Sequence, residues 1–371
     1  MISIFKGGVK IINSRIKKVR IQMEKSNIDY LILGPSANMY YLSGLLPHFD
    51  ERLQLLILGL EGNKKIVIPE MYRKQLEDEE IEGDIFFWKD EENPVMIVKR
   101  ILKESKNKKF AIDDNLWFSH IFNLKEIVSL ENVYPASMIM KAVRMIKDED
   151  EINNLKKAGQ IADKVMEEIK AFIKAGLSEK EIGLEIEMRL KKYSDGLSFE
   201  PLVGAGSNGA LGHHKPGEYT IKNGDFIIHD FGCKVGGYCS DTTRTFALGN
   251  VSDKMKEVYN VVKEAQQKAF EFVKPGVKCE ELDAVARDVI ESAGYGEFFT
   301  HRTGHGVGLD IHEAPYIVSG NDLEVKKGMV FTIEPGIYIP EEFGIRIEDT
   351  IFVTNSGANR FNNTTHDLEV L

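Results

Sequence analysis

The chain has 371 residues, 43% of them hydrophobic and 29% charged, and its 48 Lys and Arg against 58 Asp and Glu give a formal net charge of −10. This composition supports at least one sizeable core and excludes disordered, collagen-like and coiled-coil chains. The negative balance argues against nucleic acid as a partner, because affinity for the phosphate backbone rests on clustered Lys and Arg.

The first third of the chain has the pattern of an α/β domain. Short β-rich runs alternate with candidate helices, and the apolar residues of these runs predict a largely buried sheet. The runs cover residues 29–33, 53–60, 65–68, 85–88 and 110–112.

The pattern changes after Val143, where charged residues 147–151 open a long amphipathic helix that ends by Gly176. Its apolar residues recur at spacings of three and four, which places one apolar stripe against a sheet. These residues are Ile152, Leu155, Ile161, Ala162, Val165, Ile169 and Phe172. We therefore expect two domains, an accessory α/β domain over 1–142 and a second domain over 143–371.

The second domain is expected to be a duplicated α+β unit. Ser178 and Glu181 form a capping box that starts a second helix. A helix over 252–274, a break at Pro275-Gly276 and a helix over 280–293 repeat this order. Gly176-Leu177 followed by Glu181-Ile182 reappears as Gly276-Val277 followed by Glu281-Leu282. Such a duplication predicts one site between two halves.

In the first half, two β runs flank Gly236-Gly237 and predict a hairpin. If its turn centres between Val235 and Gly236, Asp230 and Asp241 lie opposite each other on one face. Opposed like charges are destabilising unless a cation or a proton lies between them. The alternative is a bulged register that leaves both acids in solvent.

The second half repeats this arrangement, with Glu334 and Glu348 opposed across a loop centred on Glu341. Both glutamates stand inside otherwise apolar β runs, where an unpaired charge is costly to bury. Two acidic pairs in two related hairpins predict a shared acidic site.

Three histidines and three glycines share residues 301–315. The glycines disfavour a helical histidine pair, and His312-Glu313 lacks the second histidine of the helical zinc-protease signature. Extended backbone close to a cofactor fits this stretch better. The residues are His301, Gly304, His305, Gly306, Gly308 and His312.

Four carboxylates and one imidazole suit two divalent metal ions, because the four negative charges of the acids balance the charges of the two cations. A site of this composition without cations would repel itself. Oxygen-rich ligation favours manganese over a thiolate-bound zinc, and cobalt or zinc are the alternatives.

One further motif, Gly204-Ala-Gly206-Ser-Asn-Gly209, matches the dinucleotide-binding pattern, which should open a helix. Pro216 and Gly217 follow closely and stop such a helix. We therefore do not expect nucleotide binding.

The cysteines and the opening residues indicate the compartment. Three cysteines, Cys233, Cys239 and Cys279, are too few for a disulfide-stapled secreted domain and are expected as core residues. No run approaches the roughly 18 apolar residues of a membrane span, and Lys6 and Lys10 interrupt any signal-peptide core. We expect a cytoplasmic protein with no membrane partner.

Together these motifs resemble the metal-dependent aminopeptidase P, prolidase and methionine aminopeptidase family, with its duplicated pita-bread fold. The resemblance covers about residues 145–371, and 29–44 resemble the start of the family's accessory, creatinase-like N-terminal domain. The family's metal ligands, in order, fall on Asp230 in HDFG, Asp241 in SDTTRTF, His305 in TGHGVGL, Glu334 in TIEPG and Glu348 in GIRIED.

The resemblance also implies roles for these ligands. Asp230 would hold one metal ion, Asp241 and Glu348 would bridge both ions, and His305 and Glu334 would hold the other. Glu334 would also serve as the general base of metal-assisted hydrolysis.

Further residues match the family's substrate site. The resemblance assigns His213, His301 and His312 to the substrate, with His312 stabilising the developing oxyanion. Arg346 would orient its neighbours by ion pairing. Tyr238 and Tyr316 are expected on the substrate side or around it.

The implied function is that of an Xaa-Pro dipeptidase, a homodimeric hydrolase of small peptides with proline at the second position. The alternative is an aminopeptidase P that acts on longer Xaa-Pro peptides. Tyr316 stands where a number of the family's dipeptidases carry arginine, which argues against anchoring of the dipeptide carboxylate through this position. A non-catalytic binding protein, or a non-metal amidinohydrolase of the same fold, would lack the metal ligands, and all five are present here.

Overall fold

The computed structural model describes residues 3–4, 9–77, 81–103 and 107–371. The chain forms two compact units, Met1–Arg144 and Met145–Leu371. Each unit has its own sheet and its own buried apolar cluster.

The first unit is built on a six-stranded mixed sheet in the order β6-β5-β4-β2-β7-β8. The five predicted β runs form β2, β4, β5, β6 and β7. The short strand β8 was not predicted, because its three residues are half-buried or exposed and carry no apolar run. The strands are β1 (Ser3–Ile4), β2 (Tyr30–Leu33), β3 (Leu45–Leu46), β4 (Leu55–Gly59), β5 (Lys65–Pro69), β6 (Asp84–Trp88), β7 (Phe110–Ile112) and β8 (Val133–Pro135).

Helices of moderate length accompany this sheet. They are α1 (Val9–Lys25), α2 (Ala37–Ser43), α3 (Arg73–Glu77), α4 (Pro94–Leu102), α5 (Phe118–Asn123) and α6 (Ser137–Arg144), with 3-10 turns η1 (Glu70–Tyr72) and η2 (Leu130–Asn132).

The second unit has an eight-stranded antiparallel sheet in the order β10-β11-β14-β20-β17-β15-β16, with β21 paired to β20. Its strands are β10 (Leu202–Ala205), β11 (Phe226–Phe231), β14 (Thr242–Ala247), β15 (Gly304–Gly306), β16 (Glu313–Ile317), β17 (Val330–Ile333), β20 (Glu348–Val353) and β21 (Ala358–Arg360). Smaller sheets contain β9 (Gly196–Leu197), β12 (Cys233–Val235) and β13 (Tyr238–Cys239), and β18 (Gly336–Ile339) with β19 (Phe343–Arg346).

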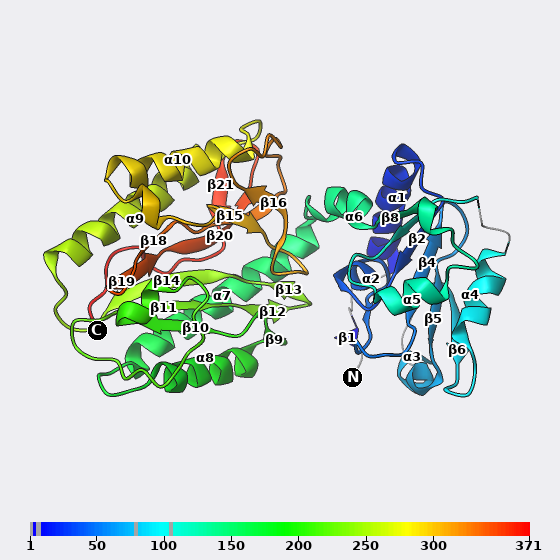
Figure 1. The fold of residues 1–371 in the computed structure, drawn as a ribbon, viewed down its shortest axis with the longest axis horizontal. Coiled ribbons are helices and arrows are strands. Elements are labelled where there is room, and N and C mark those ends of the chain that lie inside the picture. The colour runs from blue at the N-terminus through cyan, green and yellow to red at the C-terminus, as the bar shows by residue number, and fades with distance from the viewer. Residues whose placement is uncertain (1–2, 5–8, 78–80, 104–106) are drawn as a thin grey trace. The chain divides into compact units, whose positions relative to one another are not determined.

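Two helix pairs enclose the strands of this unit. Figure 1 shows the strands between the green helices α7 (Glu149–Phe172) and α8 (Glu179–Tyr193) and the yellow helices α9 (Asp253–Phe272) and α10 (Cys279–Ser292). Two short 3-10 helices, η3 (Gly206–Ala210) and η4 (Gly296–Phe298), complete the unit. Each helix pair packs on its own apolar cluster, so each half of the unit has a core of its own.

The predicted duplication is confirmed in detail. Gly176 and Gly276 both have positive φ, 96° and 93°, in the turn that joins the helices of a pair. The N–H of Gly176 donates to the carbonyl of Ile221 (3.0 Å), and that of Gly276 donates to Val325 (2.9 Å). Equivalent backbone hydrogen bonds therefore attach one helix turn to the loop before β11 and the other to the loop before β17.

The predicted register of the first hairpin is wrong, because its turn is centred one residue later in the chain than expected. Val235 pairs with Tyr238 around Gly236-Gly237, and Asp230 pairs with Thr243. Both glycines have positive φ (57° and 83°), as a two-residue hairpin turn requires. Asp241 precedes Thr243 by two residues, so it lies diagonally across from Asp230 on the same face.

The predicted register of the second hairpin is confirmed. Ile339 pairs with Phe343 around Glu341, and Gly336 pairs with Arg346. Further along, Ile333 pairs with Asp349 at the same offset. This offset places Glu334 across from Glu348.

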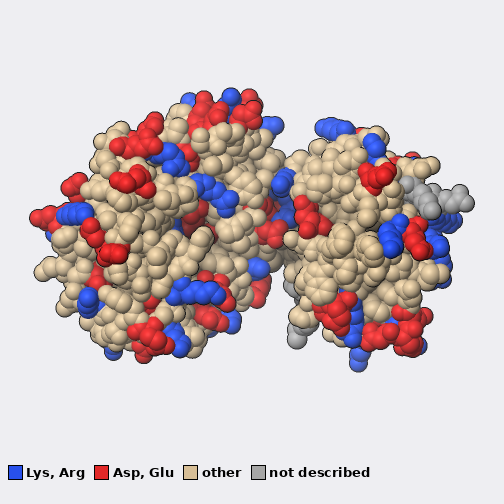
Figure 2. All heavy atoms as spheres, viewed as in Figure 1, with Lys and Arg blue, Asp and Glu red and all other residues tan. Residues whose placement is uncertain are grey.

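The surface carries both signs of charge. On the face shown in Figure 2, the Lys and Arg side chains and the Asp and Glu side chains are interspersed. Among the described residues, none of the helices combines the length and the apolar character that crossing a bilayer requires.

Candidate metal centre

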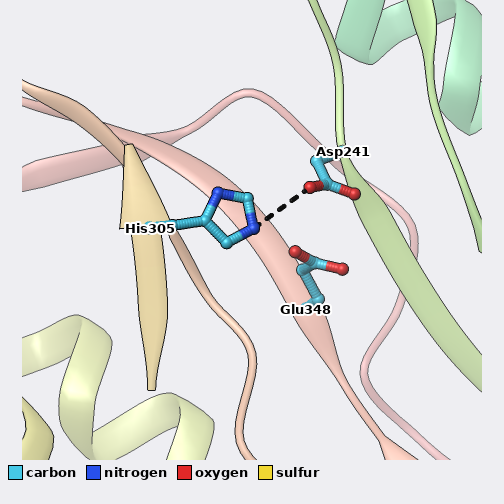
Figure 3. Close-up of side chains that lie close together, drawn as sticks. All are labelled: Asp241, His305 and Glu348. Carbon is cyan, nitrogen blue, oxygen red and sulfur yellow. Dashed lines mark ion pairs between the residues drawn. The ribbon is translucent and has the colours of Figure 1, made fainter. Parts of the chain in front are cut away.

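Three buried side chains from different strands meet at the middle of the large sheet. Asp241 immediately precedes β14, His305 lies on β15, and Glu348 begins β20. One ligand atom from each lies within 4.8 Å of the other two. Figure 3 shows the His305 ring pointing at Asp241, with Glu348 beside them, and the His305 Nε2 to Asp241 Oδ2 distance is 3.5 Å.

The other two predicted ligands adjoin this group. Glu334 Oε1 lies 3.3 Å from His305 Nε2. Asp230 Oδ2 accepts from Arg346 Nη2 at 2.5 Å. Arg346 Nε also donates to Thr243 Oγ1 (3.1 Å), and this hydroxyl donates to Glu348 Oε2 (2.6 Å). The structure therefore brings all five side chains to one place, from both halves of the unit.

Without a bound cation, the buried carboxylates of this site repel one another. Burial, and then the charges of Glu348 and Asp230, hold the pKa of Asp241 well above its usual range. Burial and then the charge of Glu334 do the same to the pKa of Glu348. Burial raises the pKa of Glu334 to about 7. Neighbouring carboxylates in one cavity cannot all ionise without a compensating cation.

Two oxygen atoms are free to bind such a cation. Asp230 Oδ1 and Glu348 Oε1 are buried and have no hydrogen-bond partner among the described residues. A buried carboxylate oxygen normally has a partner. The site thus fits divalent metal ions by its oxygen-rich donor set, its orphaned oxygens and a neutral imidazole, since burial lowers the pKa of His305 to about 3.

The histidines assigned to the substrate lie around the proposed ligands. The His305 and His312 rings meet edge to face with centroids 4.3 Å apart. His213 and His312 are exposed, and the charge of His213 contributes to lowering the pKa values of both His301 and His312. Partial loss of solvent around each ring is the main cause of both shifts, and in the more buried His301 it lowers the pKa to about 4.

Tyr338 links His301 to the carboxylates and was missed in the sequence. Its hydroxyl accepts from Arg346 Nη1 (2.8 Å) and lies 2.9 Å from His301 Nε2. A phenol inside the apolar run of β18 was the available signal. Thr243 was also missed, because the shifted hairpin register concealed that it faces Asp230.

The two tyrosines expected around the substrate have different surroundings. Tyr316 pairs with His305 across β15 and β16, and the Arg302 guanidinium lies 4.6 Å from its ring centroid. Tyr238 is buried, and its hydroxyl donates to Glu151 Oε1 (3.0 Å) in the first turn of α7. The three cysteines are free and buried, as expected for core residues.

Comparison with known proteins agrees with this geometry. Residues 153–355 match the model of metallopeptidase family M24, and residues 15–146 match the creatinase/prolidase N-terminal domain. An Xaa-Pro dipeptidase of Lactobacillus helveticus is 37% identical over 96% of this chain and 98% of its own length.

Solved structures agree in fold as well as in sequence. The prolidase of Thermococcus sibiricus has a TM-score of 0.93 and 41% identity, over 98% of this chain and 100% of its own. The X-Pro aminopeptidase of Thermotoga maritima has a TM-score of 0.84 and 31% identity, over 96% and 99%. Such matches imply a pita-bread fold and a peptidase that uses divalent metal ions. The chain belongs to metallopeptidase family M24 and carries the creatinase/prolidase N-terminal domain in front of its catalytic unit.

Proposed function

We propose that this protein is an Xaa-Pro dipeptidase that works with two divalent metal ions. The observation that carries the proposal is the convergence of Asp241, His305 and Glu348, with ligand atoms within 4.8 Å of one another, beside Asp230 and Glu334. The relatives named as Xaa-Pro dipeptidase and prolidase, which match nearly the full chain, support the choice of substrate.

The ligands divide between two ions in this proposal. Asp230 would hold one ion, His305 and Glu334 would hold the other, and Asp241 and Glu348 would contribute to both. The orphaned oxygens of Asp230 and Glu348 support this division, because each is a donor atom that the protein leaves unused. Manganese is the proposed metal, with cobalt or zinc as alternatives.

The residues around the ions carry the reaction. When bound, the cations would lower the pKa of a water molecule and polarise the scissile carbonyl. Glu334 takes a proton from the attacking water and delivers it to the proline nitrogen as the bond breaks. Arg346 holds Asp230, and through Thr243 it also holds Glu348, so that both carboxylates keep their orientation.

The histidines act on the substrate. His312 lies beside His305 and donates to the developing oxyanion. His301, held by the Tyr338 hydroxyl, and His213 fix the ends of the dipeptide and the proline ring. An Xaa-Pro bond is a tertiary amide without an N–H, so these contacts recognise ring shape rather than a backbone donor.

The substrate assay separates the two peptidase functions. Metal-stripped protein is reloaded with manganese, and kcat/KM is measured for Leu-Pro and for Leu-Pro-Pro. We expect Leu-Pro to be cleaved. Turnover of the tripeptide without any cleavage of the dipeptide would favour an aminopeptidase P instead. Glu334→Gln protein, prepared identically, controls for contaminating peptidases.

The assembly and compartment belong to the same proposal. We place the enzyme in the cytoplasm as a homodimer, as its resemblance to prolidases implies. Light scattering of the purified protein tests the dimer, and a molar mass of 41.9 kDa, that of one chain, would exclude it.

A further inference from the structure

The glycine-rich segment that resembles a nucleotide-binding motif has another use in this fold. After β10 it forms only the five-residue 3-10 helix η3. Its Gly209 packs on Gly344 of β19, where a Cβ at Gly344 would overlap the carbonyl oxygen of Gly209. The glycines therefore permit backbone to lie on backbone. The segment is packed against the strand that carries Arg346, which leaves it no room to cradle a phosphate.

A single buried carboxylate holds both ends of the chain segment that begins there. Glu179 lies in the first turn of α8 and is fully buried. Its Oε1 accepts from the Ala205 N–H (2.8 Å) and from Asn208 Nδ2 (3.1 Å). Its Oε2 meets His214 Nε2 (2.7 Å) and accepts from the Gly217 N–H (3.1 Å). All four partners belong to residues 205–217.

The helix supports this contact in two ways. A carboxylate in the first helical turn is favoured by the helix dipole, and four charge-assisted hydrogen bonds offset the cost of its burial. One turn later, a Cβ at Gly183 would lie 3.2 Å from the Pro216 ring, so a glycine lets the segment approach α8 closely. The segment is thus clamped at both ends to one helix.

The residue that this clamp places is His213. It is exposed, and its ring has no hydrogen bond among the described residues, whereas its neighbour His214 is bound to Glu179. His213 nonetheless lies near enough to His301 and His312 to affect their pKa values. Its position therefore depends on the backbone on either side of it.

We propose that Glu179 is a positioning residue for substrate binding, which holds residues 205–217 so that His213 faces the substrate. This inference rests on the proposed dipeptidase function. It assigns the substrate contact to His213 and its placement to a carboxylate on α8, outside the metal centre.

The test uses the full-length, manganese-loaded enzyme with Leu-Pro. Glu179→Ala should raise KM about tenfold while kcat changes less than about threefold. Glu179→Gln should recover part of the loss, because its amide oxygen still accepts from Ala205. In a His213→Ala background, Glu179→Ala should change KM by less than about twofold, since the two residues act in series. Bound manganese should equal that of the wild type in every variant.

Glu181→Ala is the matched control. Glu181 lies in the same turn of α8 but is exposed and caps the helix through Ser178. Its loss should lower the thermal midpoint of unfolding without raising KM. Amide exchange of Gly217 should accelerate in Glu179→Gln, where the side-chain NH2 replaces the Oε2 acceptor, and stay unchanged in Glu181→Ala, which checks the clamp without reference to activity.

The outcomes separate the two proposals. A wild-type enzyme that cleaves Leu-Pro overturns the positioning role alone if KM is unchanged in Glu179→Ala, or if both KM and Gly217 exchange are unchanged in Glu179→Gln. Fully additive effects of Glu179 and His213 substitutions on KM overturn it too. A wild type that cleaves no Xaa-Pro dipeptide overturns the proposed function, and with it this inference.

Discussion

The two halves of the catalytic unit hold their histidine segments with the same chemistry but from different places. In the first half Glu179 clamps the segment of His213. In the second half Asp283 of α10 accepts from the N–H and hydroxyl of Thr303 (3.1 and 2.7 Å). Its partner Arg287 donates to the carbonyl of His301 (3.0 Å). Each half thus uses one buried carboxylate on its second helix.

The positions of these carboxylates are not equivalent in the repeat. Counted from Gly176 and Gly276, Cys279 occupies the place of Glu179, and Gly183 occupies the place of Asp283. The turn glycines and the backbone ties around them are shared. Duplication therefore accounts for the helix frame, whereas the anchoring of each histidine segment is particular to its half.

The largest expected effect concerns the metal centre, which should need both halves equally. Asp241→Asn removes a ligand from the first half and Glu348→Gln removes one from the second. Each should lower kcat for Leu-Pro about a thousandfold or more and reduce bound manganese, because both carboxylates are proposed to bridge the ions. Steady-state kinetics and elemental analysis give both numbers. A near-wild-type kcat in either variant would contradict the claim that the metal centre needs ligands from both halves.

A smaller effect is expected from the anchor in the second half. Asp283→Ala leaves the Thr303 donors unpaired and Arg287 without its partner, and should lower the free energy of unfolding by about 3 kcal/mol. Asp288→Ala, on the exposed face of the same helix, should change it by less than about 0.5 kcal/mol. Urea denaturation measures both. Equal, small effects would show that Asp283 does not anchor its segment.

The metal centre should also make stability depend on pH once the metal is removed. Above pH 7, His301 and His305 are neutral in both states, because burial lowers their pKa values to about 4 and 3. Burial raises the pKa of Glu334 to about 7, and those of Asp241 and Glu348 lie well above their usual range. The folded state then keeps protons that unfolded carboxylates have released. Stability should fall as pH rises from 7 to 8, the interval over which Glu334 loses its proton, by up to about 1.4 kcal/mol per pH unit for each proton that the folded state retains.

Thermal unfolding of chelator-treated protein across this range measures the slope. Saturating manganese should abolish it, because the cations replace the protons. Asp241→Asn and Glu348→Gln should each reduce the slope of the stripped protein. Stability that rises with pH over this window would contradict the placement of these carboxylates in one cavity.

The smallest effect concerns the two helix caps. Ser178 Oγ accepts from the Glu181 N–H (3.2 Å), and Glu181 accepts from the Ser178 N–H (2.8 Å). At the equivalent place Lys278 donates its N–H to Glu281 (2.7 Å), but an ammonium group cannot accept the return bond. Ser178→Ala should cost about 1 kcal/mol, and Lys278→Ser should add about 0.5 kcal/mol. The midpoints of urea denaturation measure both changes. A loss of stability in Lys278→Ser would contradict the claim that Lys278 caps its helix less well than Ser178 does.

Much of the frame was predictable because its determinants are local. The capping box at Ser178, the apolar spacing of α7 and the loop at Glu341 each depend on residues within a few positions of one another. The first hairpin failed because its turn could centre at two neighbouring places, and a shift of one position in the turn replaced Asp241 by Thr243 opposite Asp230.

Contacts between distant residues were beyond the sequence pattern. The loop clamp joins Glu179 to partners up to 38 positions away, and the Thr243 contact with Glu348 spans 105 positions. The Tyr238 hydroxyl meets Glu151 across 87 positions. These contacts form only when distant elements of the unit pack together. The spacing of residues along the chain does not predict them.

The pairing of β14 with β20 joins the two halves of the sheet and has a consequence for how the enzyme folds. These two strands, Thr242–Ala247 and Glu348–Val353, meet only across a long stretch of sequence, and closing such a long loop is slow. Each helix pair can pack on its own apolar cluster before that closure. The proposed metal ligands of the two halves would therefore come together only late in folding, and an excess of manganese during refolding should raise the final yield without accelerating the early steps.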